Sequence, residues 1–571
     1  QMTAVGTLAL AASTTATGCT AVGFRSLNDN TTGSWNVGLG YDALGVNTTG
    51  VDNTAVGTFA LDASTTGDDN TGLGYAALSA NTTGDNNTAV GMNSLLANTT
   101  AGGNVAVGRG ALETNTTGGG NNAVGYLALR DNTTGVENVA VGTLALLVNT
   151  TGNYNVSVGN DSLDANTTGS YNTALGNDSL STNTTASNNT AVGNSALFAN
   201  TTGAQNVSVG ANALDANTTA ANNTALGYNA LTLNTTGAQN VGLGAYALQA
   251  NTTAAYNVGI GYNTLGATTT GQQNVAIGGE ALDANTTGEY NVAIGTSALG
   301  ANTTASYNTA VGTSALLANT TGAYNTASGY GAMLDNTTGE GNVAIGMYAL
   351  RKNTTASGNI AIGWDTLDEN TTGASNIAIG KQALTANTTG AQNTAVGLNA
   401  LVLNTEGSYN VSLGNYAGQT ITTGDGCVSL GYNANPSSAT VDNEFTLGSS
   451  SITSLRCNDT TISSLSDSRD KTDVIDSPYG LGFINTVRPV QFKWESRDGN
   501  GKDGWTRVGF IAQELLVACD GNNAVLDLVS EENPEKLEAK YGNLLPIAIQ
   551  AIQELSAQVD ALTARIQTLE G

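Results

Sequence analysis

Few side chains in this sequence are suited to catalysis or metal binding. The chain of 571 residues contains no histidine, and 11% of its residues are charged, against roughly 25% in an ordinary globular protein. Catalytic and metal sites depend on histidine and on clustered carboxylates. The composition therefore argues against most enzymes and predicts no metal and no cofactor, although chemistry based on Asp and Glu alone, or on Ser with Lys, remains open.

The carboxylates and thiols do not recur at the sequence spacing that is typical of metal ligands. Asp68-Asp69 and Asp368-Glu369 could bind calcium weakly, but solvated surface charge is the favoured interpretation. The four cysteines are far apart in sequence, and no pair has the spacing of a zinc site or a redox motif. We expect free thiols at Cys19, Cys427, Cys457 and Cys519.

The elements that would position such residues follow a 17-residue period. Glycine stands at every seventeenth position from Gly6 to Gly431, and a leucine follows four residues after each glycine up to Gly414, except at Met333 and Gly418. The unit N-T-T-G-x-x-N-T/V-A-V-G-x-x-A-L-x-A is too short for a helix pair and rich in poor helix formers. The sequence predicts a mainly β fold in which each unit forms one coil of a parallel β-solenoid, with successive coils in register.

One unit illustrates the expected coil. In Asn291 to Gly295, Val292 and Ile294 share one face of a short strand, Ala293 takes the other, and Gly295 permits a tight turn. We expect a second extended stretch to carry Leu299, the Val, Ile and Leu side chains to form the core, and the Ala face to let parallel chains approach closely. At about 4.8 Å per coil, the repeats would form a rod about 120 Å long, with asparagines stacked in two amide ladders.

The repeat surface offers three further interpretations. Twenty units carry Asn-Thr-Thr, an N-glycosylation acceptor, but stacked turns explain the motif without a glycan. Rows of threonine also suggest ice binding, but adjacent threonines point to opposite faces of an extended segment. Exposed aromatic residues can stack on sugars, but packing over turns on the neighbouring coil is the favoured interpretation for Trp35, Tyr154, Tyr171, Tyr256, Tyr290, Tyr307, Tyr324 and Tyr409.

Charge density marks a second domain. Residues 1–430 hold 6 basic and 24 acidic residues, whereas residues 431–571 hold 11 and 20. We predict a shaft at 1–431, a β-rich connector or distal tip at 432–465 and a small α+β module at 466–571. The module should contain a strand at 489–494, a helix at 511–518 and a coiled coil at 544–570 with its seam at Ile552, Leu555, Val559, Leu562, Ile566 and Leu569.

Charge and hydropathy also limit the partners. The net charge of −27 opposes nucleic-acid binding, which needs a basic surface. The chain has no run of 18 apolar residues, so we expect no membrane insertion. No signal peptide is visible, and the first residues already lie inside a repeat, so the native beginning is expected to be missing.

Two resemblances follow from these motifs. The N-x-V-A-I-G strand with the following G-x-x-A/S-L resembles the head repeats of trimeric autotransporter adhesins, which implies a trimeric β-roll. The motifs 466–471 (S-D-S-R-D-K), 490–494 (V-Q-F-K-W) and 509–514 (G-F-I-A-Q-E), followed by the helix from Leu544 to Leu569, resemble the C-terminal intramolecular chaperone domain of phage tail spikes and fibres, known from endosialidases. The residue types in the seam slightly favour a two-stranded coiled coil, but our prediction remains a trimer.

The second resemblance implies self-cleavage. In that family a serine is the nucleophile and a lysine five residues later is its base, which corresponds here to Ser466 and Lys471, with the cut between Leu465 and Ser466. Desolvation can lower a lysine pKa enough for this role, and Ser-Lys pairs need no histidine. Without the resemblance, the spacing carries almost no information, and a salt bridge from Lys471 to Asp467 or Asp470 is the ordinary expectation.

The resemblances imply a homotrimeric phage tail fibre or spike, extracellular and part of the virion. Its expected partners are a glycan or protein receptor on the host cell and virion proteins bound through the missing N-terminus. A cellular trimeric surface adhesin with a retained C-terminal trimerisation domain is the alternative. A glycan-degrading fibre would need a groove of acidic and arginine side chains, which six basic residues in 430 disfavour.

Overall fold

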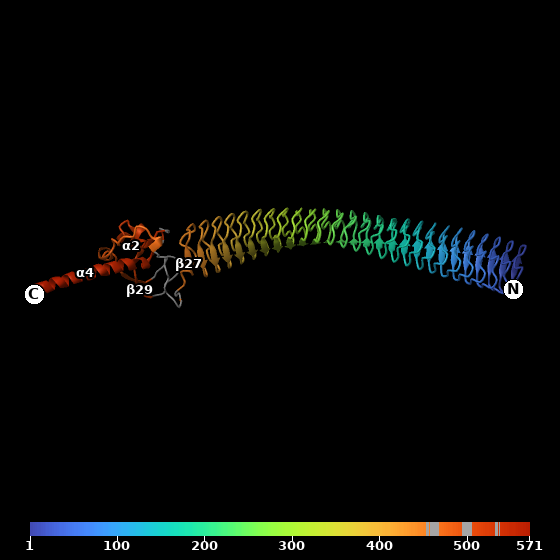
Figure 1. Ribbon diagram of the computed structural model, residues 1–571, viewed down its shortest axis with the longest axis horizontal. Helices are drawn as coiled ribbons and strands as arrows, with labels where there is room; N and C mark the ends of the chain where they lie inside the picture. Colours follow the sequence, from blue (N-terminus) through green and yellow to red (C-terminus); the bar gives the residue numbers. More distant parts are fainter. Residues whose placement is uncertain (453–455, 457–467, 494–504, 532–534, 536) are drawn as a thin grey trace. The chain divides into compact units, whose positions relative to one another are not determined.

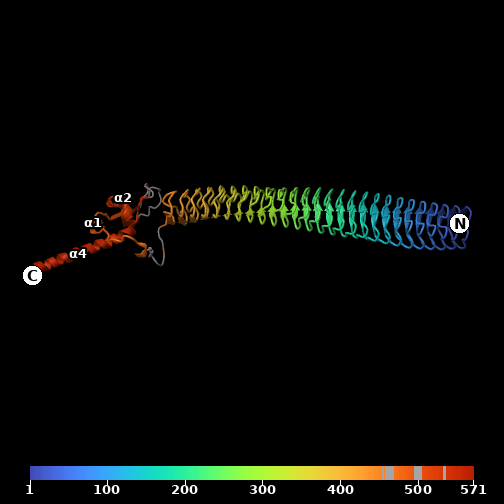
Figure 2. The same cartoon turned by 45° about the horizontal axis from the view of Figure 1, so that its top comes forward.

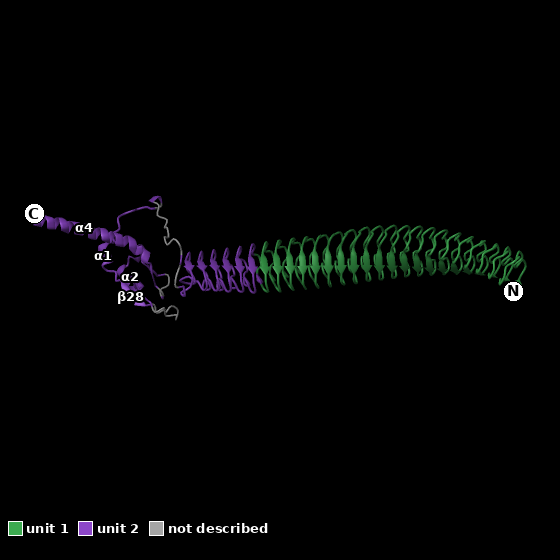
Figure 3. Cartoon of the chain, turned by 90° about the horizontal axis from the view of Figure 1, so that it is seen from below, with its two compact units in different colours: residues 1–348, 353–355 green, residues 349–352, 356–571 purple. Residues whose placement is uncertain are grey.

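The computed structural model describes residues 1–571 except 453–455, 457–467, 494–504, 532–534 and 536. The chain forms two compact units, residues 1–348 with 353–355 and residues 349–352 with 356–571 (Figure 3). The first unit consists of repeat coils alone. The second contains further coils and the C-terminal module.

Each coil contributes one strand of three residues. In the first unit these are β1 Thr3–Val5, β2 Thr20–Val22, β3 Val37–Leu39, β4 Thr54–Val56, β5 Thr71–Leu73, β6 Thr88–Val90, β7 Val105–Val107, β8 Asn122–Val124, β9 Val139–Val141, β10 Val156–Val158, β11 Thr173–Leu175, β12 Thr190–Val192, β13 Val207–Val209, β14 Thr224–Leu226, β15 Val241–Leu243, β16 Val258–Ile260, β17 Val275–Ile277, β18 Val292–Ile294, β19 Thr309–Val311, β20 Thr326–Ser328 and β21 Val343–Ile345. In the second unit they are β22 Ile360–Ile362, β23 Ile377–Ile379, β24 Thr394–Val396, β25 Val411–Leu413, β26 Val428–Leu430 and β27 Phe445–Leu447.

Successive strands within each unit pair in parallel at a separation of 17 residues (Figure 1). Val156 lies opposite Thr173 in the first unit, and Val411 lies opposite Val428 in the second. The prediction of a mainly β, parallel solenoid of 17-residue coils in register is confirmed.

The face of the strand that lines the core is the opposite of the predicted one. The central Ala293 is fully buried, whereas Ile294 on the outer face is exposed. The interior of the coil is filled by Ala293, Ala298 and Leu299 together with buried asparagines. Because so small a coil leaves little room between the strand and the opposite turns, it accepts alanine from the strand and turns the larger Val and Ile outward.

The leucine that recurs once in each coil lies in a turn and not in a second extended stretch. Leu299 has φ 53°, in the left-handed region that bulky residues normally avoid. Its side chain is fully buried, and its N–H donates to the carbonyl of Ala315 in the next coil at 3.0 Å. Burial and hydrogen bonding offset the strain, so the expectation of an extended stretch at Leu299 was wrong.

Both predicted asparagine ladders are present. In the first, the Asn155 N–H donates to Asn138 Oδ1 of the preceding coil at 3.0 Å, and Asn155 Nδ2 donates to the Gly169 carbonyl at 2.9 Å. In the second, Asn166 Nδ2 donates to Asn149 Oδ1 at 2.8 Å. These amides are fully buried, so they join successive coils from inside.

The second ladder consists of the asparagines of the Asn-Thr-Thr motifs. In Asn166 the amide nitrogen that a glycan would occupy is buried and donates two hydrogen bonds, so the folded coil does not present it for glycosylation. The first threonine is also engaged, since the Thr150 hydroxyl donates to the Thr167 carbonyl at 2.9 Å. The motif is therefore a structural element of the coil.

Several aromatic residues pack on their neighbours in adjacent coils. The ring centroids of Tyr290 and Tyr307 lie 5.0 Å apart, and those of Tyr307 and Tyr324 lie 5.2 Å apart, in both pairs with planes inclined by 4°. Each ring covers a face of the next, which removes that face from any sugar. This geometry agrees with the favoured interpretation of packing between coils.

The parallel sheet includes a further coil beyond Gly431, within the segment predicted as connector. Strand β27 pairs with β26 through Val428 and Phe445. At the ladder position of this coil stands Glu444, whose carboxylate accepts hydrogen bonds from the Ser437 N–H at 2.9 Å and the Ser437 hydroxyl at 2.6 Å. The glutamate thus holds the last turn in place.

Cysteines replace asparagine at two positions of the first ladder. Cys19 and Cys427 are buried free thiols, as is Cys519 in the C-terminal module. The Cys427 thiol donates to the Val441 carbonyl at 3.0 Å, and burial raises its pKa. These three cysteines match the expectation of free thiols, and Cys457 lies outside the described residues.

The C-terminal module is small and mixed (Figure 2). Its elements are η1 Ser468–Asp470, α1 Leu481–Ile484, β28 Val490–Lys493, β29 Thr506–Gly509, α2 Ala512–Ala518, α3 Asn523–Leu526, β30 Val529–Ser530, β31 Glu538–Ala539, η2 Tyr541–Asn543 and α4 Leu544–Glu570. Strands β28 and β29 pair antiparallel, as do β30 and β31. The predicted strand, the short helix and the long terminal helix correspond to β28, α2 and α4.

The core of the module joins α2, α3 and the beginning of α4. It is formed by the buried residues Leu515, Cys519, Leu526, Leu528, Val529, Leu544 and Ile547. Helix α1 also packs against α4, and the α1 residue Leu481 donates its N–H to Glu554 Oε2 at 2.8 Å. In the part of the chain that the structure describes, the buried residues of α4 all lie in its N-terminal part.

Candidate functional site

The predicted cleavage site lies at the start of the C-terminal module. Leu465, Ser466 and Asp467 fall outside the described residues. Lys471 follows η1, is exposed, and donates its backbone N–H to the Ser468 carbonyl at 3.4 Å. The pairing of Ser466 with Lys471, and the alternative salt bridges of Lys471, therefore stay predictions.

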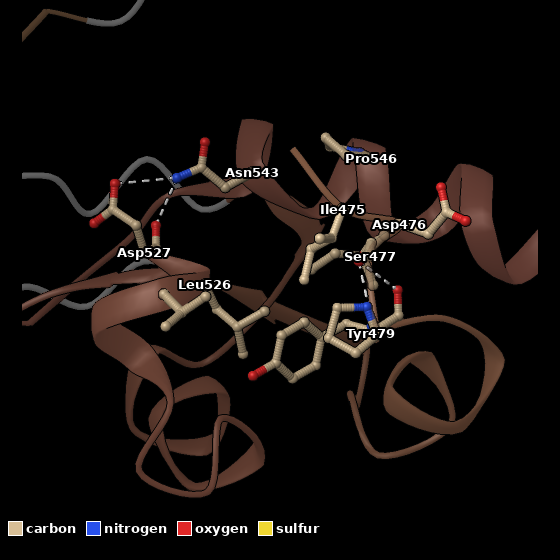
Figure 4. Close-up of a pocket in the computed structure, with 11 residues that line it drawn as sticks. Ile475, Asp476, Ser477, Tyr479, Leu526, Asp527, Asn543 and Pro546 are labelled. Atoms are coloured by element: carbon tan, nitrogen blue, oxygen red, sulfur yellow. Dashed lines mark hydrogen bonds between the residues drawn. The ribbon is translucent and has the colours of Figure 1, made fainter. Parts of the chain in front are cut away.

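A pocket of about 520 Å³ lies in the same module (Figure 4). One wall is the segment from Ile475 to Tyr479, which follows Lys471 closely in sequence. The rest comes from the end of α3 and the beginning of α4, including Val525, Leu526 and Ile547. Sequence reasoning missed this pocket because its walls lie about 50 to 70 residues apart along the chain, with no motif that connects them.

The polar groups around the pocket are engaged in local structure. The Ser477 hydroxyl accepts the Tyr479 N–H and donates to the Tyr479 carbonyl, both at 3.2 Å. The Asp527 carboxylate pairs with Lys540 Nζ at 2.8 Å and accepts from Asn543 Nδ2 at 3.2 Å. The described residues of the lining include no lysine, cysteine or histidine.

The rim of the pocket is apolar and open. Ile475 and Val525, which both line it, are 81% and 74% exposed. Val508 in β29 and Val517 in α2 are exposed to a similar extent. Large apolar exposure of this kind is typical of surfaces that associate with another protein.

Helix α4 carries the most regular apolar surface of the module. Leu544, Ile547 and Ala551 in its first two turns are buried. The predicted heptad seam beyond them is solvent-exposed along its length, with Ile552 at 66% and Leu569 at 80%. Figure 2 shows this C-terminal part extending away from α1 and α2.

The candidate calcium ligands have other partners. The Asp368 carboxylate pairs with Arg351 at 2.7 Å, and burial raises its pKa although Arg351 opposes the shift. Asp68 Oδ1 accepts the Val51 N–H at 2.8 Å. Among the residues that the structure describes, no three His, Cys, Asp or Glu side chains gather as metal ligands, and no helix has the length and hydropathy needed to span a bilayer.

A comparison with protein families places the C-terminal module. Residues 466–524 match the family model of the chaperone of endosialidase. The matched chaperone segment begins at the predicted nucleophile and runs through α1, β28, β29 and α2 into α3. No curated protein and no solved structure matches the chain.

The chaperone segment and the solenoid together fit a tail fibre or tail spike that carries an endosialidase-type chaperone at its C-terminal end. The resemblance drawn from the motifs at 466–471, 490–494 and 509–514 is thereby confirmed. All three motifs lie within the matched residues.

Proposed function

We propose that this chain is the protomer of a homotrimeric tail fibre or spike that attaches a virion to a host-cell surface. The C-terminal module brings three chains together, aligns them and then cleaves itself off between Leu465 and Ser466. The mature product is the solenoid shaft, with its receptor a glycan or protein of the host.

The exposed seam of α4 is the observation that carries this proposal. Its six apolar positions repeat at intervals of three and four residues and are all exposed in the single chain. Burial of such a side chain contributes roughly 1.5–3 kcal/mol, so three copies of α4 gain substantially by packing seam against seam. Together with the chaperone segment, the seam supports self-association of this module.

The shaft explains why such a module is needed. Its coils are nearly identical, and each strand pairs equally well with many others of the same composition. Chains that meet one coil out of step would be trapped in a wrong register. Assembly at one end selects a single alignment before the remaining coils come together.

The cleavage step requires only residues of the chain and water. The Ser466 hydroxyl oxygen attacks the carbonyl carbon of Leu465, and the neutral amine of Lys471 takes the hydroxyl proton. The peptide C–N bond breaks as its nitrogen takes up a proton, and water then hydrolyses the ester to free the Leu465 carboxylate and the serine hydroxyl. Loss of the folding aid makes unfolding hard to reverse and so confers kinetic stability.

The assembly role of α4 is tested by charge in its seam. Val559→Asp with Ile566→Asp places two carboxylates at seam positions, whereas Ala557→Asp with Ala564→Asp places them on the outer face of the same helix. We expect the seam variant to lose the trimer in sedimentation equilibrium and the control to keep it. A trimer of unchanged stability in the seam variant would contradict the proposal.

A further inference from the structure

The outer face of the strands forms an apolar ridge, defined here as the third residue of each strand. In the first unit this residue is Val, Leu or Ile in every strand from β1 to β21, except Ser328 in β20. Many of these side chains are more than one-third exposed, for example Val141 at 38% and Leu226 at 48%. From β2 to β21 the central residue of each strand is buried and faces away from the ridge, as in β9 and β14.

Charge is excluded from this face. No residue of β1–β27 is charged, although the chain has a net charge of −27. The acidic side chains lie on the turns, as Asp42, Asp161 and Asp178 do. Parallel copies of so acidic a chain repel one another least when the surfaces in contact carry no charge, and the strand face meets that condition.

The exposed apolar area is also large for a surface that remains in water. A fully exposed aliphatic side chain presents roughly 60–120 Å² of apolar area, so the twenty apolar ridge side chains of the first unit, at about one-third exposure, present on the order of 400–800 Å². A monomeric protein ordinarily exposes apolar patches of a few hundred Å², and each partner of a stable complex buries about 800 Å². The ridge therefore approaches the size of an interface.

The period of the ridge indicates which molecule packs against it. Its side chains recur once per 17-residue coil, at the spacing of parallel strands. A surface that is apolar, uncharged and matched to this spacing over so many coils is supplied by another copy of the same chain.

We propose that the ridge is the surface on which the copies of the shaft pack against one another, parallel and in register. The proposal deepens the homotrimeric assembly stated above and rests on it. It also replaces the predicted role of the alanine face, because Ala140 and its equivalents are buried within their own coils.

The test is chemical crosslinking at matched positions of one coil of the full-length chain. Val141→Cys places a thiol on the ridge of β9, and Thr151→Cys places one on an exposed turn of the same coil. The unsubstituted chain controls for the native cysteines, and sedimentation equilibrium of each variant gives its oligomeric mass. Each sample is treated with a short thiol–thiol crosslinker and analysed under denaturing conditions.

We expect each variant to have the mass of a trimer. We also expect the yield of crosslinked chains to be at least tenfold higher for Val141→Cys than for Thr151→Cys. A trimer in which the two variants crosslink equally, or in which Val141→Cys does not crosslink, overturns the ridge as the interface and leaves the homotrimer standing. A monomeric mass for the unsubstituted chain overturns the homotrimer and the ridge proposal with it.

Discussion

The second asparagine ladder contains a defect that can be repaired. Ser64 occupies a ladder position and is fully buried. In the preceding coil, Asn47 Oδ1 is buried without a hydrogen-bond partner, and so is Ser64 Oγ. Where the ladder is intact, the equivalent oxygen of Asn115 accepts from Asn132 Nδ2 at 2.7 Å. The substitution Ser64→Asn should supply the missing donor in a space that neighbouring coils already provide.

The expected gain follows from the groups that become paired. A buried acceptor without a partner costs about 1–3 kcal/mol, and Ser64→Asn removes two such oxygens at the expense of one side chain's conformational entropy. We expect the free energy of local opening near this coil to rise by about 2 kcal/mol, which corresponds to roughly 30-fold slower exchange of its amide hydrogens. Hydrogen exchange followed by mass spectrometry of peptides around residues 47–81 measures this change directly.

The reverse substitution provides the matched control. Asn132→Ser creates the same defect in an intact part of the ladder, so it should accelerate exchange locally by a similar factor. Exchange around residue 64 that is unchanged or faster in Ser64→Asn, with Asn132→Ser still destabilising, would refute the reasoning that the orphaned oxygens limit stability at this coil.

Three further predictions concern the shaft. Gly159→Ala should lower the melting temperature strongly, because a Cβ there meets the Gly176 carbonyl oxygen at φ +146°, whereas Gly279→Ala, with open space, should not. Burial raises the pKa of Asp215 in the folded protein, so the folded protein loses stability as the pH rises above the pKa of this group in the unfolded chain. Asp215→Asn should therefore raise the melting temperature at pH 7 but not at pH 3. Equal shifts at the two pH values would contradict this. Ser328→Val should raise the melting temperature if the ridge is buried between copies, and no change would count against that.

The period predicted the fold but not which strand face is inside. Seventeen residues without insertion require stacked coils in register, and the repeated asparagine requires ladders. Alternation in Val292-Ala293-Ile294 defines two faces without saying which one is buried. That choice depends on how much volume Leu299 and the asparagines leave, a property of the closed coil. The left-handed conformation of Leu299 also arises only from tertiary packing.

The candidate site was predictable where a motif lies on one segment. The chaperone segment was found from short runs of residues, and helix α4 from its heptads. The pocket was not, because Ile475, Val525 and Pro546 meet only in the folded module. Lys471 is exposed and Ser466 lies outside the described residues, so the pairing of these two residues stays a prediction.

The intact mass of the expressed chain tests the central claim most directly. Wild type, Ser466→Ala and Lys471→Ala are produced in parallel and analysed by mass spectrometry under denaturing conditions. The account predicts fragments 1–465 and 466–571 from wild type and an uncut chain from both variants. An uncut wild-type chain would contradict self-cleavage and favour a cellular adhesin that retains its trimerisation domain. The same cut in Ser466→Ala would contradict Ser466 as the nucleophile.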